Sequence, residues 1–139
     1  MDLYEQLVEI YLTVFEENFV LPQPAVKLGA NDSPIGLFET GSEWDAWPDF
    51  IGLDFKGKRI QVVEVSKTTT VSEVRGKLKK YEDKHYDAWI RRILPKGMND
   101  FPITRRFFVR ASVKEKLGPT ETEISTLEHV FDVIRDKMP

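Results

Sequence analysis

The 139-residue chain contains no cysteine. This excludes disulfide bonds, thiolate metal sites and cysteine nucleophiles, and it is typical of proteins of the reducing cytoplasm. The only two histidines, His85 and His129, fall in separate predicted helices, which argues against a histidine metal site. No glycine-rich phosphate-binding motif occurs. Carboxylates and basic side chains are therefore the main candidates for chemistry.

The chain also lacks long apolar runs. Its longest ones are far too short to span a membrane, and its first nine residues include acidic side chains but no basic leader. We therefore expect a cytoplasmic protein without a membrane partner. A content of 41% hydrophobic and 31% charged residues predicts a globular chain. The length predicts a single domain over residues 1–139.

Basic residues are scarce at the start of the chain and abundant later. The formal net charge of −3 does not by itself imply a nucleic-acid partner. However, Lys27 is the only basic residue among the first 54, whereas residues 75–110 are rich in lysine and arginine. These positions are either solvated faces or a phosphate-binding side of the domain. For the second reading, the candidate nucleic-acid contacts are Arg75, Lys77, Lys80 and Lys84.

Hydrophobic periodicity and turn residues predict a series of elements along the chain. They are a helix over 2–19, short extended pieces near 25–29 and 35–40, a hairpin of two strands over 49–67 around Gly57, a long helix over 68–94, a strand over 103–112, and a final amphipathic helix with Ile124, Leu127, Phe131 and Ile134 inward. This pattern predicts an α/β domain with a central mixed sheet flanked by helices, in the order α-β-β-β-α-β-α.

The predicted hairpin carries two acidic residues in unusual settings. Asp49 follows proline in "WPDF", and Glu64 lies in the apolar run "QVVEV". On neighbouring strands, the two carboxylates can share one Mg²⁺ or Mn²⁺ ion, which neutralises phosphate charge and lowers the pKa of a water. In the alternative reading, Asp49 only begins a strand and Glu64 ends one at the solvent edge. The apolar flanks of Glu64 favour the metal site.

The motifs "WPDF" and "VVEVSK", followed by a capped helix and a further strand, resemble the PD-(D/E)XK nuclease superfamily, which has a restriction-endonuclease-like fold. The resemblance covers about residues 1–112, mostly as element order. It implies that Asp49 and Glu64 bind Mg²⁺ or Mn²⁺. It also implies that a lysine two residues after the glutamate orients or activates the attacking water, and that the substrate is DNA.

The lysine departs from the family pattern. Ser66 occupies the position that shares a strand face with Glu64, and Lys67 comes one residue later. Three explanations remain open. Lys67 reaches the site because the strand ends or bulges there, a lysine of the next helix (Lys77 or Lys80) supplies the charge, or the site has lost its chemistry and only binds. We favour Lys67, because strand alternation often breaks at a strand-to-helix junction.

The sequence thus predicts metal-dependent hydrolysis of DNA phosphodiester bonds, with Asp49, Glu64 and Lys67 as catalytic residues. The alternative is a catalytically silent module that binds nucleic acid or a protein partner in a larger complex. A homodimer is compatible with either function. Further candidate acidic ligands are Glu39, Glu43 and Asp45 before the motif and Glu5 or Glu9 on the first helix. Candidates for base stacking are Trp44 and Trp47.

Overall fold

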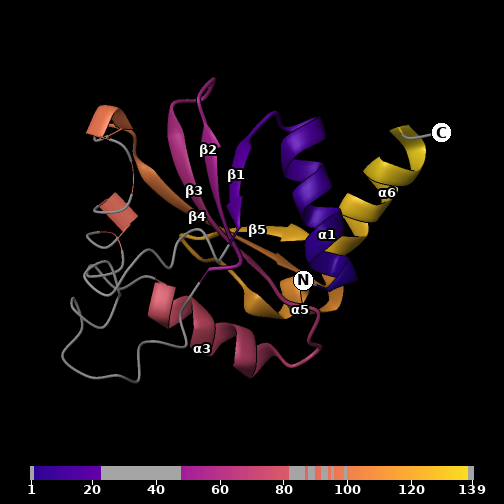
Figure 1. The fold of residues 1–139 in the computed structure, drawn as a ribbon. Helices are drawn as coiled ribbons and strands as arrows, with labels where there is room; N and C mark the ends of the chain where they lie inside the picture. The colour runs from indigo at the N-terminus through magenta and orange to yellow at the C-terminus, as the bar shows by residue number, and fades with distance from the viewer. Residues whose placement is uncertain are drawn as a thin grey trace.

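The computed structural model describes residues 2–22, 48–81, 87, 90, 91, 94, 96–98 and 100–137. Its centre is a five-stranded mixed sheet in which the spatial order β1-β2-β3-β4-β5 equals the chain order (Figure 1). The strands are β1 (Phe19–Pro22), β2 (Phe50–Asp54), β3 (Arg59–Val65), β4 (Ile103–Val109) and β5 (Glu123–Thr126). The first three strands are antiparallel, whereas β3, β4 and β5 run parallel.

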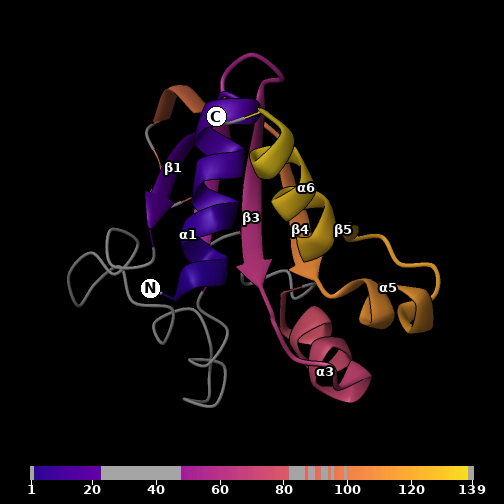
Figure 2. The ribbon, with the colours of Figure 1, turned by 90° about the vertical axis from the view of Figure 1, so that its right-hand side faces the viewer.

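Helices cover both faces of the sheet. On one face lie α1 (Leu3–Ile10), its π-helical continuation η1 (Tyr11–Phe15) and α6 (Leu127–Lys137), which pack side by side (Figure 2). On the other face lie α3 (Val71–Tyr81) and α5 (Ala111–Leu117), and η5 (Lys96–Met98) precedes β4. The sheet and the two helix layers form an α/β domain, and no helix in the described residues is long and apolar enough to cross a membrane.

Each face of the sheet has its own hydrophobic core, because side chains alternate along each strand. Val63 and Phe108 point toward α1 and α6, where they join Val8 and Leu12. The neighbouring residues point to the opposite side and pack on α3 and α5, in a cluster that includes Ile51, Val62, Val74, Leu78, Phe107 and Val113. The alternation therefore determines which helix layer each polar strand residue faces.

The predicted hairpin over 49–67 is confirmed as β2 and β3. Asp54 closes its turn by accepting hydrogen bonds from the Gly57 N–H (2.8 Å) and from Arg59 Nε (3.1 Å). These bonds stabilise the charged carboxylate and hold the pKa of Asp54 below its ordinary value. The turn lies at the end of the hairpin away from Asp49 and Glu64.

Two parts of the described chain differ from the sequence prediction. The first helix does not run to residue 19, because Phe19–Pro22 forms β1 against β2. The segment after β4 forms α5 and then β5, where the sequence predicts only one helix. Ile124 therefore belongs to a strand and not to the final helix. The extended pieces expected near 25–29 and 35–40, and much of the predicted helix beyond Tyr81, lie outside the described residues.

Arg106 of β4 is a buried cation beneath η1. Its side chain is only 7% exposed and bonds to Ser125 Oγ (2.9 Å), Glu16 Oε1 (2.5 Å) and, at 3.5 Å, Glu123 Oε2. Its guanidinium also lies 4.6 Å from the centre of the Phe108 ring. The arginine thus ties β4 to β5 and to the end of η1.

We expect Arg106→Met to lower the free energy of unfolding by about 3 kcal/mol, because it leaves partly buried carboxylates without their cation. Urea denaturation monitored by circular dichroism measures this loss. Arg135→Met is the matched control, since Arg135 is 72% exposed and pairs only with exposed aspartates of α6. The control should change stability by less than about 0.5 kcal/mol. Equal effects of the two substitutions would show that the ion pairs of Arg106 do not stabilise the fold.

Candidate active site

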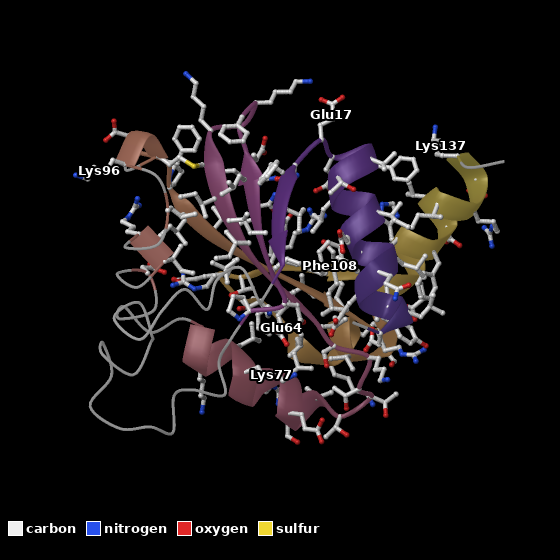
Figure 3. The ribbon with its side chains drawn as sticks, viewed as in Figure 1. Glu17, Glu64, Lys77, Lys96, Phe108 and Lys137 are labelled. Carbon is white, nitrogen blue, oxygen red and sulfur yellow. The ribbon has the colours of Figure 1, made fainter. Side chains whose placement is uncertain are left out.

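The two acidic residues of the hairpin meet at one edge of the sheet. Asp49 immediately precedes β2 and Glu64 lies near the end of β3, and the register that pairs Phe50 with Val63 makes Asp49 and Glu64 cross-strand neighbours. Their side chains share the sheet face that packs on α3, the face of Ile51 and Val62. Figure 3 shows Glu64 at this edge, with α3 beneath it.

Backbone groups of Val63 and Val65, the residues before and after Glu64, hold Asp49 in place. The Asp49 N–H donates to the Val63 carbonyl (3.1 Å), and Asp49 Oδ2 accepts a hydrogen bond from the Val65 N–H (2.8 Å). The carboxyl groups of Asp49 and Glu64 lie within hydrogen-bonding reach of each other. This arrangement fixes the pair before any ligand arrives.

Glu64 is buried and Asp49 is partly buried, and burial is the main influence on the charge of Asp49. The Glu64 side chain is only 8% exposed. Burial, followed by the charge of Glu64, raises the pKa of Asp49 to about 7, although the Val65 N–H and Lys77 act in the opposite direction. Near neutral pH Asp49 therefore still binds a proton part of the time. A cation that replaced this proton would relieve the repulsion between the two carboxylates, so the pair fits the requirement of a divalent metal ion.

Among the described residues, Lys77 brings an ammonium group to the carboxylate pair. It projects from α3, and its Nζ lies 3.5 Å from Glu64 Oε1. The helix positions it because Val74 and Leu78 are buried in the core beneath the sheet, which directs the neighbouring Lys77 to the rim of that contact. The Lys77 side chain remains 46% exposed, so it can also reach a bound substrate.

Lys67 lies on the sheet face that α1 covers, whereas Glu64 faces α3. This differs from the expectation that Lys67 reaches the carboxylates. Its Nζ is 3.9 Å from Asp2 Oδ2 and 5.9 Å from the centre of the Tyr4 ring. The reason is that alternation persists to the end of the strand. Ser66 is buried and its N–H still donates to the Phe108 carbonyl (2.9 Å), so no bulge turns Lys67 toward Glu64.

The first helix contributes one acid to this edge. The pKa of Glu5 is raised by burial and then by the negative charges of Asp49 and Asp2. The charge of Asp49 therefore acts on the Glu5 carboxylate. Nevertheless, no set of three acidic or histidine side chains gathers around a potential metal position within the described part of the chain. Several predicted residues lie outside that part, namely Glu39, Glu43, Trp44, Asp45, Trp47, Lys84 and His85.

The remaining basic candidates lie on α3. Arg75 is exposed, and its Nη2 donates to the Lys116 carbonyl at the end of α5 (2.8 Å). The side chain of Lys80 is outside the described part of the structure. Of the nucleic-acid contacts expected from the sequence, the structure therefore places Lys77 at the carboxylates and Arg75 two residues earlier on the same helix.

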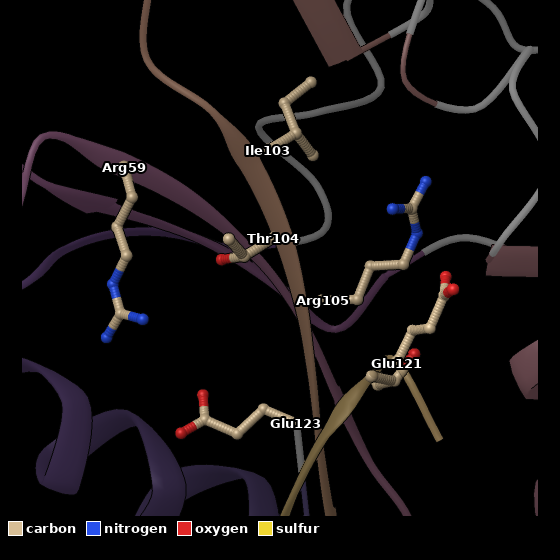
Figure 4. A pocket seen from close by; sticks show the side chains of 7 residues that line it. Arg59, Ile103, Thr104, Arg105, Glu121 and Glu123 are labelled. Atoms are coloured by element: carbon tan, nitrogen blue, oxygen red, sulfur yellow. The ribbon is translucent and has the colours of Figure 1, made fainter.

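A pocket of about 400 Å³ lies beside the start of β4 and is separate from the carboxylate pair (Figure 4). Arg59 and Arg105 line it together with Glu121 and Glu123. Both arginines already have carboxylate partners, Asp54 for Arg59 and Asp87 for Arg105. The pocket therefore offers little uncompensated charge to a ligand.

Comparison with known proteins leaves the carboxylate pair and Lys77 as the main guide to function. No protein-family model, curated protein or solved structure matches the chain.

Proposed function

We propose that this protein is a metal-dependent nuclease that hydrolyses phosphodiester bonds in DNA. The observation that carries the proposal is the Asp49–Glu64 pair, in which burial and then the charge of Glu64 raise the pKa of Asp49 to about 7, with the Lys77 ammonium 3.5 Å from Glu64. Buried acids held together against their repulsion are costly to a fold, and such groups cluster at functional sites.

Asp49 and Glu64 are the residues that would hold Mg²⁺ or Mn²⁺. When bound, the ion supplies positive charge to the phosphate and acidifies a water. The hydrogen bond from the Val65 N–H orients the Asp49 carboxylate, and burial of Glu64 limits competing contacts with solvent. These features prepare both acids to act as charged oxygen ligands.

Lys77 supplies the positive charge that the family pattern assigns to a strand lysine. Its ammonium donates to Glu64 and, being half-exposed, is available to hold a water or a phosphate oxygen beside the carboxylates. We therefore assign to Lys77 the role that the sequence assigned to Lys67. The proposed phosphate contacts are Arg75 and Lys77 on α3, together with Lys80 and Lys84, which follow them in the sequence.

The arrangement of the elements supports the resemblance to the PD-(D/E)XK superfamily. A helix, three antiparallel strands, a second helix and a parallel strand follow one another, and the motif residues lie at the hairpin. We include the restriction-endonuclease-like fold in the proposal. α5 and β5 then extend the sheet beyond the part that the sequence motif covers.

The test combines cleavage with thermal stability. We expect plasmid and branched DNA to be cut with Mg²⁺ or Mn²⁺ and to remain intact with EDTA. Millimolar Mg²⁺ should raise Tm, because the ion binds the folded protein alone. The Glu64→Gln variant should lose both the cleavage and the shift in Tm. Metal-independent Tm values together with intact DNA under all these conditions would contradict the nuclease proposal.

The second candidate function is a silent nuclease-fold module that binds nucleic acid or a protein partner. Two observations favour it. Ser66 occupies the buried position of the family lysine, and one oxygen of Asp49 already accepts the Val65 N–H. Retained DNA binding without cleavage under any metal condition would favour this candidate over the enzyme.

A further inference from the structure

A second basic group lies at the same edge of the sheet, on the side of α1. Arg110, the residue after β4, donates from Nη2 to the Tyr4 hydroxyl (3.0 Å) and from Nε to the Lys67 carbonyl (3.2 Å). The Arg110 guanidinium and the Lys67 ammonium also lie 5.2 Å and 5.9 Å from the centre of the Tyr4 ring. We call Tyr4, Lys67 and Arg110 the Tyr4 cluster.

The charge of the Tyr4 cluster is largely uncompensated. Arg59, Arg105, Arg106 and Arg135 all pair with carboxylates. By contrast, the hydrogen-bond partners of Arg110 in the described chain are a hydroxyl and a carbonyl, both uncharged. Lys67 is 60% exposed, and its 3.9 Å contact with the exposed Asp2 is a weak pair that an incoming anion can replace. The cluster therefore presents two cations from a fixed support.

The Tyr4 cluster and the carboxylate pair are close along the chain and share one edge. Lys67 follows Glu64 by three residues, about 10 Å of extended chain. Tyr4 adjoins Glu5, whose carboxylate senses the charge of Asp49. Lys77 approaches this edge from α3, on the opposite face of the sheet. Cations thus stand on both sides of the two acids.

We propose that the Tyr4 cluster binds a phosphate of the same nucleic-acid strand that Asp49 and Glu64 act on, next to the phosphate at the cleaved bond. This assignment rests on the proposed nuclease function and gives Lys67 a role in substrate binding in place of chemistry. The two positive charges attract the phosphate, and the long lysine side chain can move to meet its oxygens. The strand crosses the sheet edge from Lys77 on the α3 side to the Tyr4 cluster on the α1 side.

The test measures affinity separately from cleavage. Binding of a fluorescein-labelled DNA duplex in EDTA is followed by anisotropy at several salt concentrations. Lys67→Ala and Arg110→Ala should each weaken binding about fivefold to tenfold and reduce the slope of log affinity against log salt by about one. At saturating DNA with Mg²⁺, the cleavage rate of Lys67→Ala should stay within about twofold of wild type, because only a phosphate contact is lost.

Two further variants separate phosphate binding from a structural role. Lys56→Ala removes an exposed lysine from the hairpin turn at the opposite end of the sheet and should bind DNA like wild type. Arg110→Lys keeps the charge but loses the paired bonds to Tyr4 and Lys67, and it should retain most of the affinity that Arg110→Ala loses. If Arg110→Lys is as weak as Arg110→Ala, the arginine acts structurally and the assignment is wrong.

The outcomes also distinguish this inference from the nuclease proposal. Normal affinity of Lys67→Ala and Arg110→Ala, in a wild-type protein that cuts DNA with Mg²⁺, overturns the Tyr4 cluster and leaves the nuclease intact. Weakened binding in both variants, with no cleavage by wild type, overturns the nuclease and supports the cluster as a phosphate contact. A wild-type protein that does not bind the duplex overturns the assignment of the cluster.

Discussion

Cleavage by the Lys77→Met variant is expected to fall at least a hundredfold, because the substitution removes the ammonium 3.5 Å from Glu64 and keeps the apolar length of the side chain. Single-turnover cleavage with saturating protein and Mg²⁺ measures the rate. Melting of the variant should change little, since the Lys77 side chain is half-exposed.

The comparison with Lys67→Met decides which lysine serves the chemistry. Lys67 faces Asp2 and Tyr4, so its loss should leave the rate at saturating DNA almost unchanged. The reverse result, with normal cutting by Lys77→Met and none by Lys67→Met, would show that substrate or metal rearranges this end of the sheet and that the Lys67 ammonium is the active one. Lys77→Arg should also be slow, because a planar guanidinium does not replace a compact charge.

The second large effect concerns stability. We expect Asp49→Asn to raise the free energy of unfolding at pH 8 in the absence of metal by about 2 kcal/mol. The rise in the pKa of Asp49 from 3.8 to about 7 sets an upper limit of about 4 kcal/mol on this gain. The asparagine can still accept a hydrogen bond from the Val65 N–H, while the repulsion with Glu64 disappears. Urea denaturation at pH 8 and at pH 4 in EDTA measures the difference.

The sign follows from the two pKa values. Asp49 has a pKa of about 7 in the folded protein, compared with 3.8 ordinarily, so the folded state prefers the protonated form. Wild-type stability should therefore fall as the pH rises from about 4 to about 7, and the gain from Asp49→Asn should grow over the same interval. A variant that is less stable than wild type at pH 8 would show that the carboxylate is a structural clamp of β3.

Asp54 provides a control of opposite sign. Its pKa is lowered by the Gly57 N–H and Arg59, so its charged form is preferred in the folded protein. Asp54→Asn should therefore lower stability at pH 8, and the loss should shrink as the pH falls below the ordinary pKa of an aspartate, 3.8. The two aspartates lie at opposite ends of the same strand, so a general effect of removing negative charge cannot explain opposite signs.

The elements that the sequence predicts well are those with a long, regular pattern. The hairpin over 49–67 has two apolar strands around a glycine turn and is confirmed as β2 and β3. β1 and β5 are only four residues each, too short for periodicity to distinguish strand from helix. Ile124 in particular keeps helical spacing with Leu127, although tertiary pairing with Phe107 of β4 places it in a strand.

The candidate site was predictable in part for the same reason. Alternation along β3 indicates that Ser66, and not Lys67, shares the face of Glu64, and the structure has this arrangement. What sequence alone does not provide is the orientation of α3 across the sheet, which decides that Lys77 contacts Glu64. The proximity of Tyr4 and Arg110 likewise depends on packing between segments more than one hundred residues apart.

Because each strand of the described chain pairs with the next one in the sequence, the sheet can grow in one direction as the polypeptide is synthesised. β2 and β3 need only a short turn to meet, so we expect Asp49 and Glu64 to come together before α3 docks on the sheet. The nascent hairpin would then carry the acid pair without Lys77. We expect docking of α3 to be more favourable in mildly acidic buffer, because the burial that docking brings favours the protonated form of Asp49.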